Sequence, residues 1–164
     1  MLNKKQTIDW NILLHDIRSV QNVASIFRMA EILGVNKIYL SGITPGPLDR
    51  FNREREDFVK ISLGTENVVK WERLENVENF ILDFKKENGV VIALEQSENS
   101  VDYKDIKIEE DKKYLIIPGR EVEGLEESIL NICDIVAEIP QYGQKESLNI
   151  FSSMSVACWR FFDR

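Results

Sequence analysis

The chain has 164 residues, 43% of them hydrophobic, and a formal net charge of −7. This size and composition fit one globular domain with a hydrophobic core. No run approaches the roughly 18 apolar residues of a membrane helix, and the first residues lead into no apolar signal core, so we expect a cytoplasmic protein without a membrane partner. The negative charge argues only mildly against a nucleic-acid partner, because residues 1–60 carry nine Lys/Arg against seven Asp/Glu.

Apolar runs alternate with amphipathic segments along the chain. Short buried strands are predicted at 11–15 and 37–41, with a helix over 19–33 between them that ends at Gly34. The pattern then predicts a helix at 77–88, strands at 90–94 and 114–117, a short helix at 125–131, a strand at 135–139 and a closing helix at 148–162. This alternation predicts an α/β domain with a mostly parallel sheet covered on both faces.

Residues 44–57 are predicted to form one long irregular stretch, and such loops are often functional. Four basic residues lie in or beside it: Arg50, Arg53, Arg55 and Lys60. Two interpretations remain open. The stretch either contacts RNA phosphates or is a solvated loop whose charges pair with Glu54, Glu56 and Asp57.

The few residues with metal-binding or nucleophilic side chains are scattered. Cys133 and Cys158 have apolar neighbours and no paired spacing, so buried free thiols are expected. His15 is the single histidine. We therefore expect no metal site, and a Ser-His-Asp triad would depend on His15 alone.

In an open parallel sheet, ligands bind beyond the carboxyl ends of the strands. Gln96, Gly119 and Pro140 each follow a predicted strand and could converge on one pocket. Ordinary turn chemistry is the alternative explanation of the glycines. Ser147 precedes the closing helix, where an N-cap is expected.

Two predicted helices favour a homodimer. Arg28 lies on the outer side of the first helix, where Met29 and Ile32 flank it and make that face partly apolar. On the closing helix, Val156 and Trp159 project away from the main apolar stripe. A helix that is apolar on more than one side is buried deeply or shared with a second subunit.

Three separated segments stand out: 22–30 with Gly34 after it, 117–125, and 139–143 leading into 147–149. In this order they resemble the three motifs of the SpoU (TrmH-like) RNA ribose methyltransferases, a branch of the SPOUT superfamily. The resemblance runs from about His15 to the C-terminus and includes residues 61–66 and 94–99.

The resemblance implies a single SpoU-type methyltransferase domain over residues 1–164, with a deep C-terminal trefoil knot that binds S-adenosyl-L-methionine. It implies a dimer with active sites at the subunit interface and methyl transfer to a ribose 2′-hydroxyl of RNA. A chain without further RNA-binding extensions favours tRNA, although ribosomal RNA remains open. The alternative is a catalytically inactive SPOUT-fold RNA-binding or scaffold protein. An ordinary nucleotide-binding domain is disfavoured because no Gly-x-Gly-x-x-Gly or Walker-type loop occurs.

The same resemblance assigns roles to individual residues. It implies cofactor contacts from Leu94, Gln96, Gly119, Ile139, Ser147 and Leu148. It places Arg28 at the transferred proton, as a base or as a positioning group, and gives Asn22, Glu121 and Asn149 the task of holding the substrate geometry.

Three departures from the family pattern bear on activity. Ala24 stands where Gly is usual, Arg120 stands where Asn or Ser is usual, and residues 150–155 are bulkier than in the family. Arg120 could pair with Glu121 or hold a phosphate, and either would alter the site.

Overall fold

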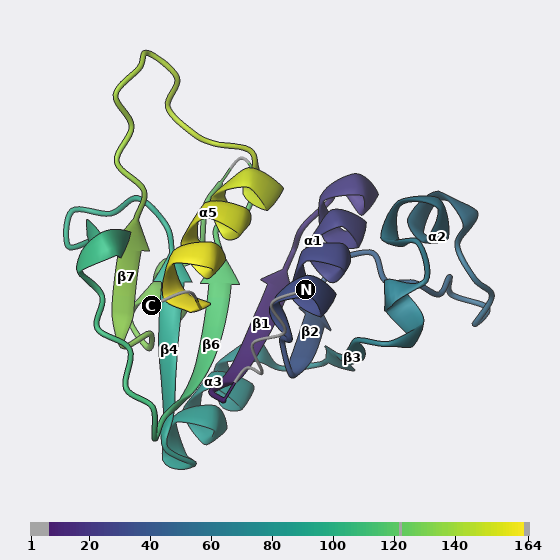
Figure 1. Ribbon diagram of the computed structural model, residues 1–164, viewed down its shortest axis with the longest axis horizontal. Helices are drawn as coiled ribbons and strands as arrows, with labels where there is room; N and C mark the ends of the chain where they lie inside the picture. The colour runs from purple at the N-terminus through teal and green to yellow at the C-terminus, as the bar shows by residue number, and fades with distance from the viewer. Residues whose placement is uncertain (1–6, 122, 163–164) are drawn as a thin grey trace.

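The computed structural model describes residues 7–121 and 123–162 and shows one α/β domain around a seven-stranded sheet (Figure 1). The strands are β1 (Asp9–His15), β2 (Lys37–Ser41), β3 (Lys70–Leu74), β4 (Gly89–Leu94), β5 (Val101–Asp102), β6 (Lys113–Pro118) and β7 (Ile135–Glu138). They lie in the order β3-β2-β1-β6-β4-β7-β5, and every pairing between them is parallel. The carboxyl ends of the strands therefore share one edge, and the prediction of a mostly parallel sheet is confirmed.

Helices cover both faces of this sheet. They are α1 (Val20–Leu33), α2 (Glu56–Ser62), α3 (Val77–Lys86), α4 (Glu127–Leu130) and α5 (Ile150–Phe162), with 3-10 turns at Thr65–Asn67 and Tyr103–Asp105. Helices α1 and α5 lie side by side on one face, and α3 lies behind the sheet (Figure 1). No helix in the described ranges is long and apolar enough to span a bilayer.

Alternating side chains of the central strands form two hydrophobic cores. In β1, Ile12 and Leu14 face the core beneath α1 and α5, whereas Leu13 faces the core that contains Ile81 and Phe84 of α3. Successive strand residues point to opposite faces, so a strand with helices on both sides must be apolar throughout. This explains why the central strands read as continuous apolar runs.

Helix α1 is held at both ends and buried on more than one side. The Ser19 hydroxyl accepts a hydrogen bond from the Asn22 amide, and Gly34 ends the helix at φ 70°. Phe27 packs edge-on against Phe58 of α2 with ring centroids 5.2 Å apart. Met29 is buried, so the expected outer apolar face of α1 is wrong at this residue, whereas Ile32 is exposed as expected.

Three short elements were missed by the sequence patterns: α2, β3 and β5. Helix α2 takes up the last two residues of the stretch 44–57 that was expected to be irregular. It begins at Glu56, and its N-cap residue Arg55 makes no side-chain capping hydrogen bond. Strands β3 and β5 form the two edges of the sheet and are mostly exposed or half-buried. Because such strands bury little surface, they lack the apolar run that identifies a central strand.

Candidate functional site

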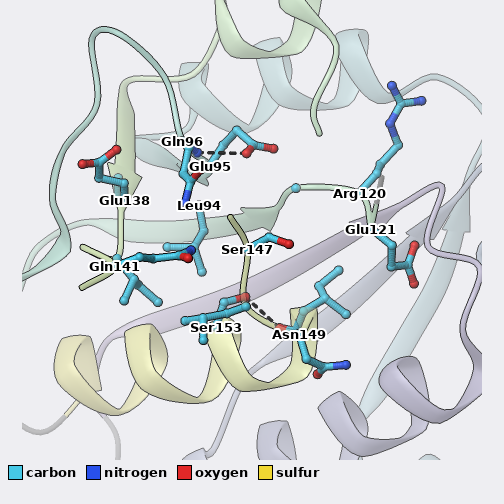
Figure 2. A pocket seen from close by; sticks show the side chains of 15 residues that line it. Leu94, Glu95, Gln96, Arg120, Glu121, Glu138, Gln141, Ser147, Asn149 and Ser153 are labelled. Atoms are coloured by element: carbon cyan, nitrogen blue, oxygen red, sulfur yellow. Dashed lines mark hydrogen bonds between the residues drawn. The ribbon is translucent and has the colours of Figure 1, made fainter. Parts of the chain in front are cut away.

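A pocket of about 340 Å³ lies at the carboxyl ends of β4, β6 and β7, against the start of α5 (Figure 2). It is lined by Leu94, Glu95, Gln96, Gly119, Arg120, Glu121, Ala137, Glu138, Ile139, Gln141, Ser147, Leu148, Asn149, Ile150 and Ser153. All six predicted cofactor-contact residues belong to this lining. The sequence-predicted convergence of three strand ends is therefore confirmed for Gln96 and Gly119, while Pro140 lies between two lining residues.

Asn149 links the start of α5 to α1. Its side-chain oxygen accepts hydrogen bonds from the backbone N–H groups of Phe151 (3.0 Å) and Ser152 (3.2 Å), so it is the N-cap of α5. Its Nδ2 donates to Oδ1 of Asn22 over 3.0 Å. The prediction that Ser147 caps a helix beginning at residue 148 is wrong, because α5 begins at Ile150 and Ser147 lies in the exposed segment before it.

Glu121 links the second segment to the first. Its carboxylate accepts hydrogen bonds from the backbone N–H groups of Arg18 and Ser19, both at 3.2 Å, just before α1. Unsatisfied N–H groups and the helix dipole make a helix N-terminus favourable for a carboxylate. Together with the Asn22–Asn149 hydrogen bond, this contact brings all three predicted segments to one site within a single chain.

Glu95 is a lining residue that the sequence reasoning missed. Its carboxylate accepts hydrogen bonds from the backbone N–H groups of Gln96 (2.9 Å) and Leu125 (3.0 Å). A Cβ atom added to Gly119 would lie 2.1 Å from Oε2 of Glu95, and one added to Gly124 would lie 2.7 Å from it. A side chain at either glycine would therefore force the flexible end of the Glu95 side chain to move, and Gly124 also has a positive φ of 69° that favours glycine. The sequence feature that could have identified Glu95 is its position directly after the predicted strand at 90–94.

Arg120 does not pair with Glu121, which was one of the two contacts expected for it. Its Nε donates to the carbonyl of Gly124 over 2.6 Å, and its Nη1 lies 3.2 Å from Glu126 and 3.7 Å from Asp16. Figure 2 shows the side chain directed away from Ser147 and Asn149. Arg120 thus holds the loop after β6, and its guanidinium is paired with carboxylates at the edge of the pocket.

His15 lies next to this ion-pair group. Its Nε2 is 3.6 Å from both Asp16 and Glu126, and its Nδ1 is 2.9 Å from the hydroxyl of Ser41. Ser41 is 1% exposed, so its hydroxyl cannot reach a substrate as a triad nucleophile would. The Arg120 guanidinium faces the same two carboxylates and offsets part of their negative charge.

Arg28 is not part of the pocket lining. Its side chain is exposed on α1, and no hydrogen bond or ion pair holds it within the described ranges. It lies six residues after Asn22, which corresponds to about 9 Å along the helix axis. The structure therefore brings Asn22, Glu121 and Asn149 together and leaves Arg28 outside the pocket of the same chain.

The pocket combines an apolar part with an acidic part. Leu94, Ile139 and Leu148 supply apolar surface, while Glu95, Glu121 and Glu138 are lining carboxylates. Arg120 is the one basic side chain among the lining residues, and it is turned away. The arrangement suits a ligand that carries both positive charge and a flat apolar group.

Comparisons with known proteins identify a family and several relatives. The family model described as "SpoU rRNA Methylase family" matches residues 9–159. A Staphylococcus aureus protein named for the TrmH family of tRNA/rRNA methyltransferases is 26% identical over 159 residues, covering 97% of this chain and 60% of that protein. The "tRNA (guanosine(18)-2'-O)-methyltransferase" of Aquifex aeolicus is 27% identical over 154 residues, covering 92% of this chain and 66% of the relative.

Among solved structures, the AdoMet-bound rRNA methyltransferase from Sinorhizobium meliloti superposes with a TM-score of 0.82 at 26% identity. The match covers 93% of this chain and 55% of that chain. The chain thus spans about three fifths of the length of the curated relatives that it matches first.

Proposed function

Since the chain belongs to the SpoU rRNA methylase family, we propose that it is an S-adenosylmethionine-dependent RNA methyltransferase that modifies a ribose 2′-hydroxyl of tRNA. The observation that carries the proposal is the gathering of all three motif segments around one pocket at the carboxyl edge of a parallel sheet. The Aquifex aeolicus relative, named for 2′-O-methylation of a tRNA guanosine, supports both the ribose and the tRNA assignment.

The residues of the pocket fit S-adenosylmethionine. Its adenine suits the apolar surface of Leu94, Ile139 and Leu148, and its sulfonium and ammonium groups suit a lining with several carboxylates and no inward-facing cation. Gly119 permits the close approach of backbone to ligand. When bound, this cofactor supplies a methyl group on a positively charged sulfur, which is a strong electrophile.

The protein then has two tasks, to align the ribose oxygen with the methyl group and to handle its proton. Asn149 is hydrogen-bonded to Asn22, and Glu121 is hydrogen-bonded to the backbone just before α1, so we assign these three residues to substrate alignment. Arg28 either accepts the hydroxyl proton or positions the nucleotide through a phosphate. Phosphate-assisted positioning is the favoured role, because a guanidinium stays protonated in ordinary surroundings.

A homodimer would bring Arg28 of one subunit close to the pocket of the other subunit. The side chain of Arg28 is exposed on α1, and on the neighbouring α5 the apolar side chains of Val156 and Trp159 are 42% and 50% exposed. Ile32 on α1 is 65% exposed. Pairing these surfaces between two copies would cover the apolar groups and place Arg28 of one copy toward the pocket of the other.

Three further expectations follow from the proposal. Residues 1–164 act as one methyltransferase domain, the protein works in the cytoplasm, and the segment between β7 and α5 is threaded as a trefoil knot. The strand order supports the knot, since β6 and β7 each insert beside the earlier strand β4. The alternative is an inactive RNA-binding protein. Arg120 gives it less support, because this side chain is turned away from the pocket, whereas the net charge of −7 still favours it.

Three measurements test this function. Isothermal titration should show binding of S-adenosylmethionine, and labelled methyl should pass to tRNA. Mass spectrometry of RNA from cells with and without the protein should then locate one ribose methylation that depends on it. Cofactor binding without transfer to any RNA would support the inactive alternative, and the absence of both would overturn the proposal.

A further inference from the structure

A short hairpin between β2 and α2 holds an aromatic residue at its tip. Leu48 and Glu54 form an antiparallel bridge, and the Asp49 amide donates to the carbonyl of Arg53 over 2.8 Å. Oδ1 of Asp49 also accepts hydrogen bonds from the backbone N–H groups of Phe51 (2.8 Å) and Arg53 (3.0 Å). The tip is therefore fixed by its own hydrogen bonds, although burial contributes little to it.

The Phe51 ring is exposed and accompanied by two guanidinium groups. The residue is 61% exposed, and the Cζ atoms of Arg50 and Arg53 lie 4.7 Å and 5.0 Å from its ring centroid. The ring contributes little to the core at this exposure, so folding alone does not account for a phenylalanine here. An exposed ring beside guanidinium planes is a surface on which an unpaired base can stack.

Beside the hairpin lies a second concavity, of about 600 Å³, between the hairpin and the end of β2. Its lining contains the basic residues Arg50, Arg53, Arg55 and Arg73, and Asp49 is its one acidic residue. The concavity is thus locally positive in a chain of net charge −7.

The four arginines are not equally available to a ligand. Arg53 pairs with Asp49 at 2.7 Å, Arg55 pairs with Asp57 at 2.8 Å, and Arg73 donates to the carbonyl of Thr44 over 2.6 Å. Pairing within the loop therefore accounts for both Arg53 and Arg55. Arg55 has the expected partner Asp57, whereas the partner of Arg53 is Asp49 and none of the three expected carboxylates.

Arg50 is the exception. Within residues 7–121 and 123–162, no carboxylate forms an ion pair with its exposed side chain. An unpaired guanidinium in a locally positive concavity favours an anionic ligand such as a phosphate.

The concavity and the pocket open at the same edge of the sheet. The concavity begins at Gly42, directly after β2, and the pocket includes Gly119, directly after β6. Only β1 lies between these two parallel strands, so their ends are two strand spacings apart, or roughly 10 Å. One RNA segment could therefore reach both.

We propose that the hairpin and its concavity bind an unpaired nucleotide of the substrate RNA, close in sequence to the nucleotide that is methylated. Its base stacks on Phe51, and its phosphate contacts Arg50. This proposal rests on the proposed function for the identity of the ligand. It adds a recognition surface that lies outside the methyl-donor pocket.

The test is binding of fluorescently labelled tRNA and of an unstructured RNA oligonucleotide, measured by anisotropy over a range of salt concentrations. Phe51→Leu should weaken binding about five- to hundredfold through lost stacking, whereas Phe51→Tyr should retain it. Arg50→Gln should also lower the salt slope of log K by about 0.7. Lys86→Gln removes the same charge from an exposed position on α3, across the sheet from α1 and α5, and should change neither quantity.

Methyl-transfer kinetics separate this proposal from the proposed function. Phe51→Leu should raise the KM for RNA and leave kcat and cofactor affinity near their wild-type values. If wild-type protein transfers methyl groups and Phe51→Leu binds RNA normally, the nucleotide site is refuted and the methyltransferase stands. If RNA binding depends on Phe51 but no methyl is transferred, the site stands and the enzymatic proposal fails. The nucleotide site would also be refuted if Phe51→Leu changed only the oligomeric state, or if the wild-type protein bound no RNA.

Discussion

Replacement of Asn149 tests whether one side chain both caps α5 and joins it to α1. Asn149→Ala removes the N-cap of α5, which costs about 1 kcal/mol, and the hydrogen bond to Asn22, which contributes about 1 kcal/mol more. We therefore expect the free energy of unfolding to fall by about 2 kcal/mol. For a chain of this length, that loss corresponds to a melting temperature lower by about 4–8 °C.

Two further variants divide this effect into its parts. Asn149→Ser keeps a capping oxygen but is too short to reach Asn22, so about half of the loss should remain. Ser147→Ala removes a hydroxyl that caps nothing and should change stability by less than about 0.5 kcal/mol. Urea denaturation followed by circular dichroism measures all three. Equal losses for Ser147→Ala and Asn149→Ala, or no loss for Asn149→Ala, would refute the assignment of the cap.

Three other predictions concern the site and the two thiols. Arg28→Ala should abolish methyl transfer. It should leave the calorimetric affinity for S-adenosylmethionine within about twofold of wild type, because Arg28 lies outside the pocket. A large loss of cofactor affinity would contradict this division of roles. Gly119→Ala should weaken cofactor binding, because the new Cβ would push the end of the Glu95 side chain aside in the pocket wall, and unchanged calorimetric affinity would count against that contact. Burial raises the pKa of the Cys133 thiol to about 12 and raises the pKa of the Cys158 thiol as well. Neither thiol should therefore react with a disulfide reagent at pH 8 until the protein is unfolded. Rapid reaction of the native protein would contradict this prediction.

The central strands were predictable because burial on both faces leaves a continuous apolar run in the sequence. The predicted strand at 37–41 coincides with β2, and those at 90–94 and 114–117 fall within one residue of β4 and β6 at each end. Helix α1 was predictable for a similar reason, since its apolar spacing, the cap at Ser19 and the stop at Gly34 are all local signals. The exposed edge strands and α2 carry no such signals.

The sequence by itself determined which residues end the strands and therefore which of them could meet at the carboxyl edge. Only the tertiary structure decided their contacts, because strand order sets which loops become neighbours and no local pattern records that order. Asn22 and Asn149 are 127 positions apart, yet they share a hydrogen bond because α1 and α5 pack on the same face. In the same way, Arg120 takes Glu126 and Asp16 as partners since the loop after β6 lies against the end of β1, one strand away.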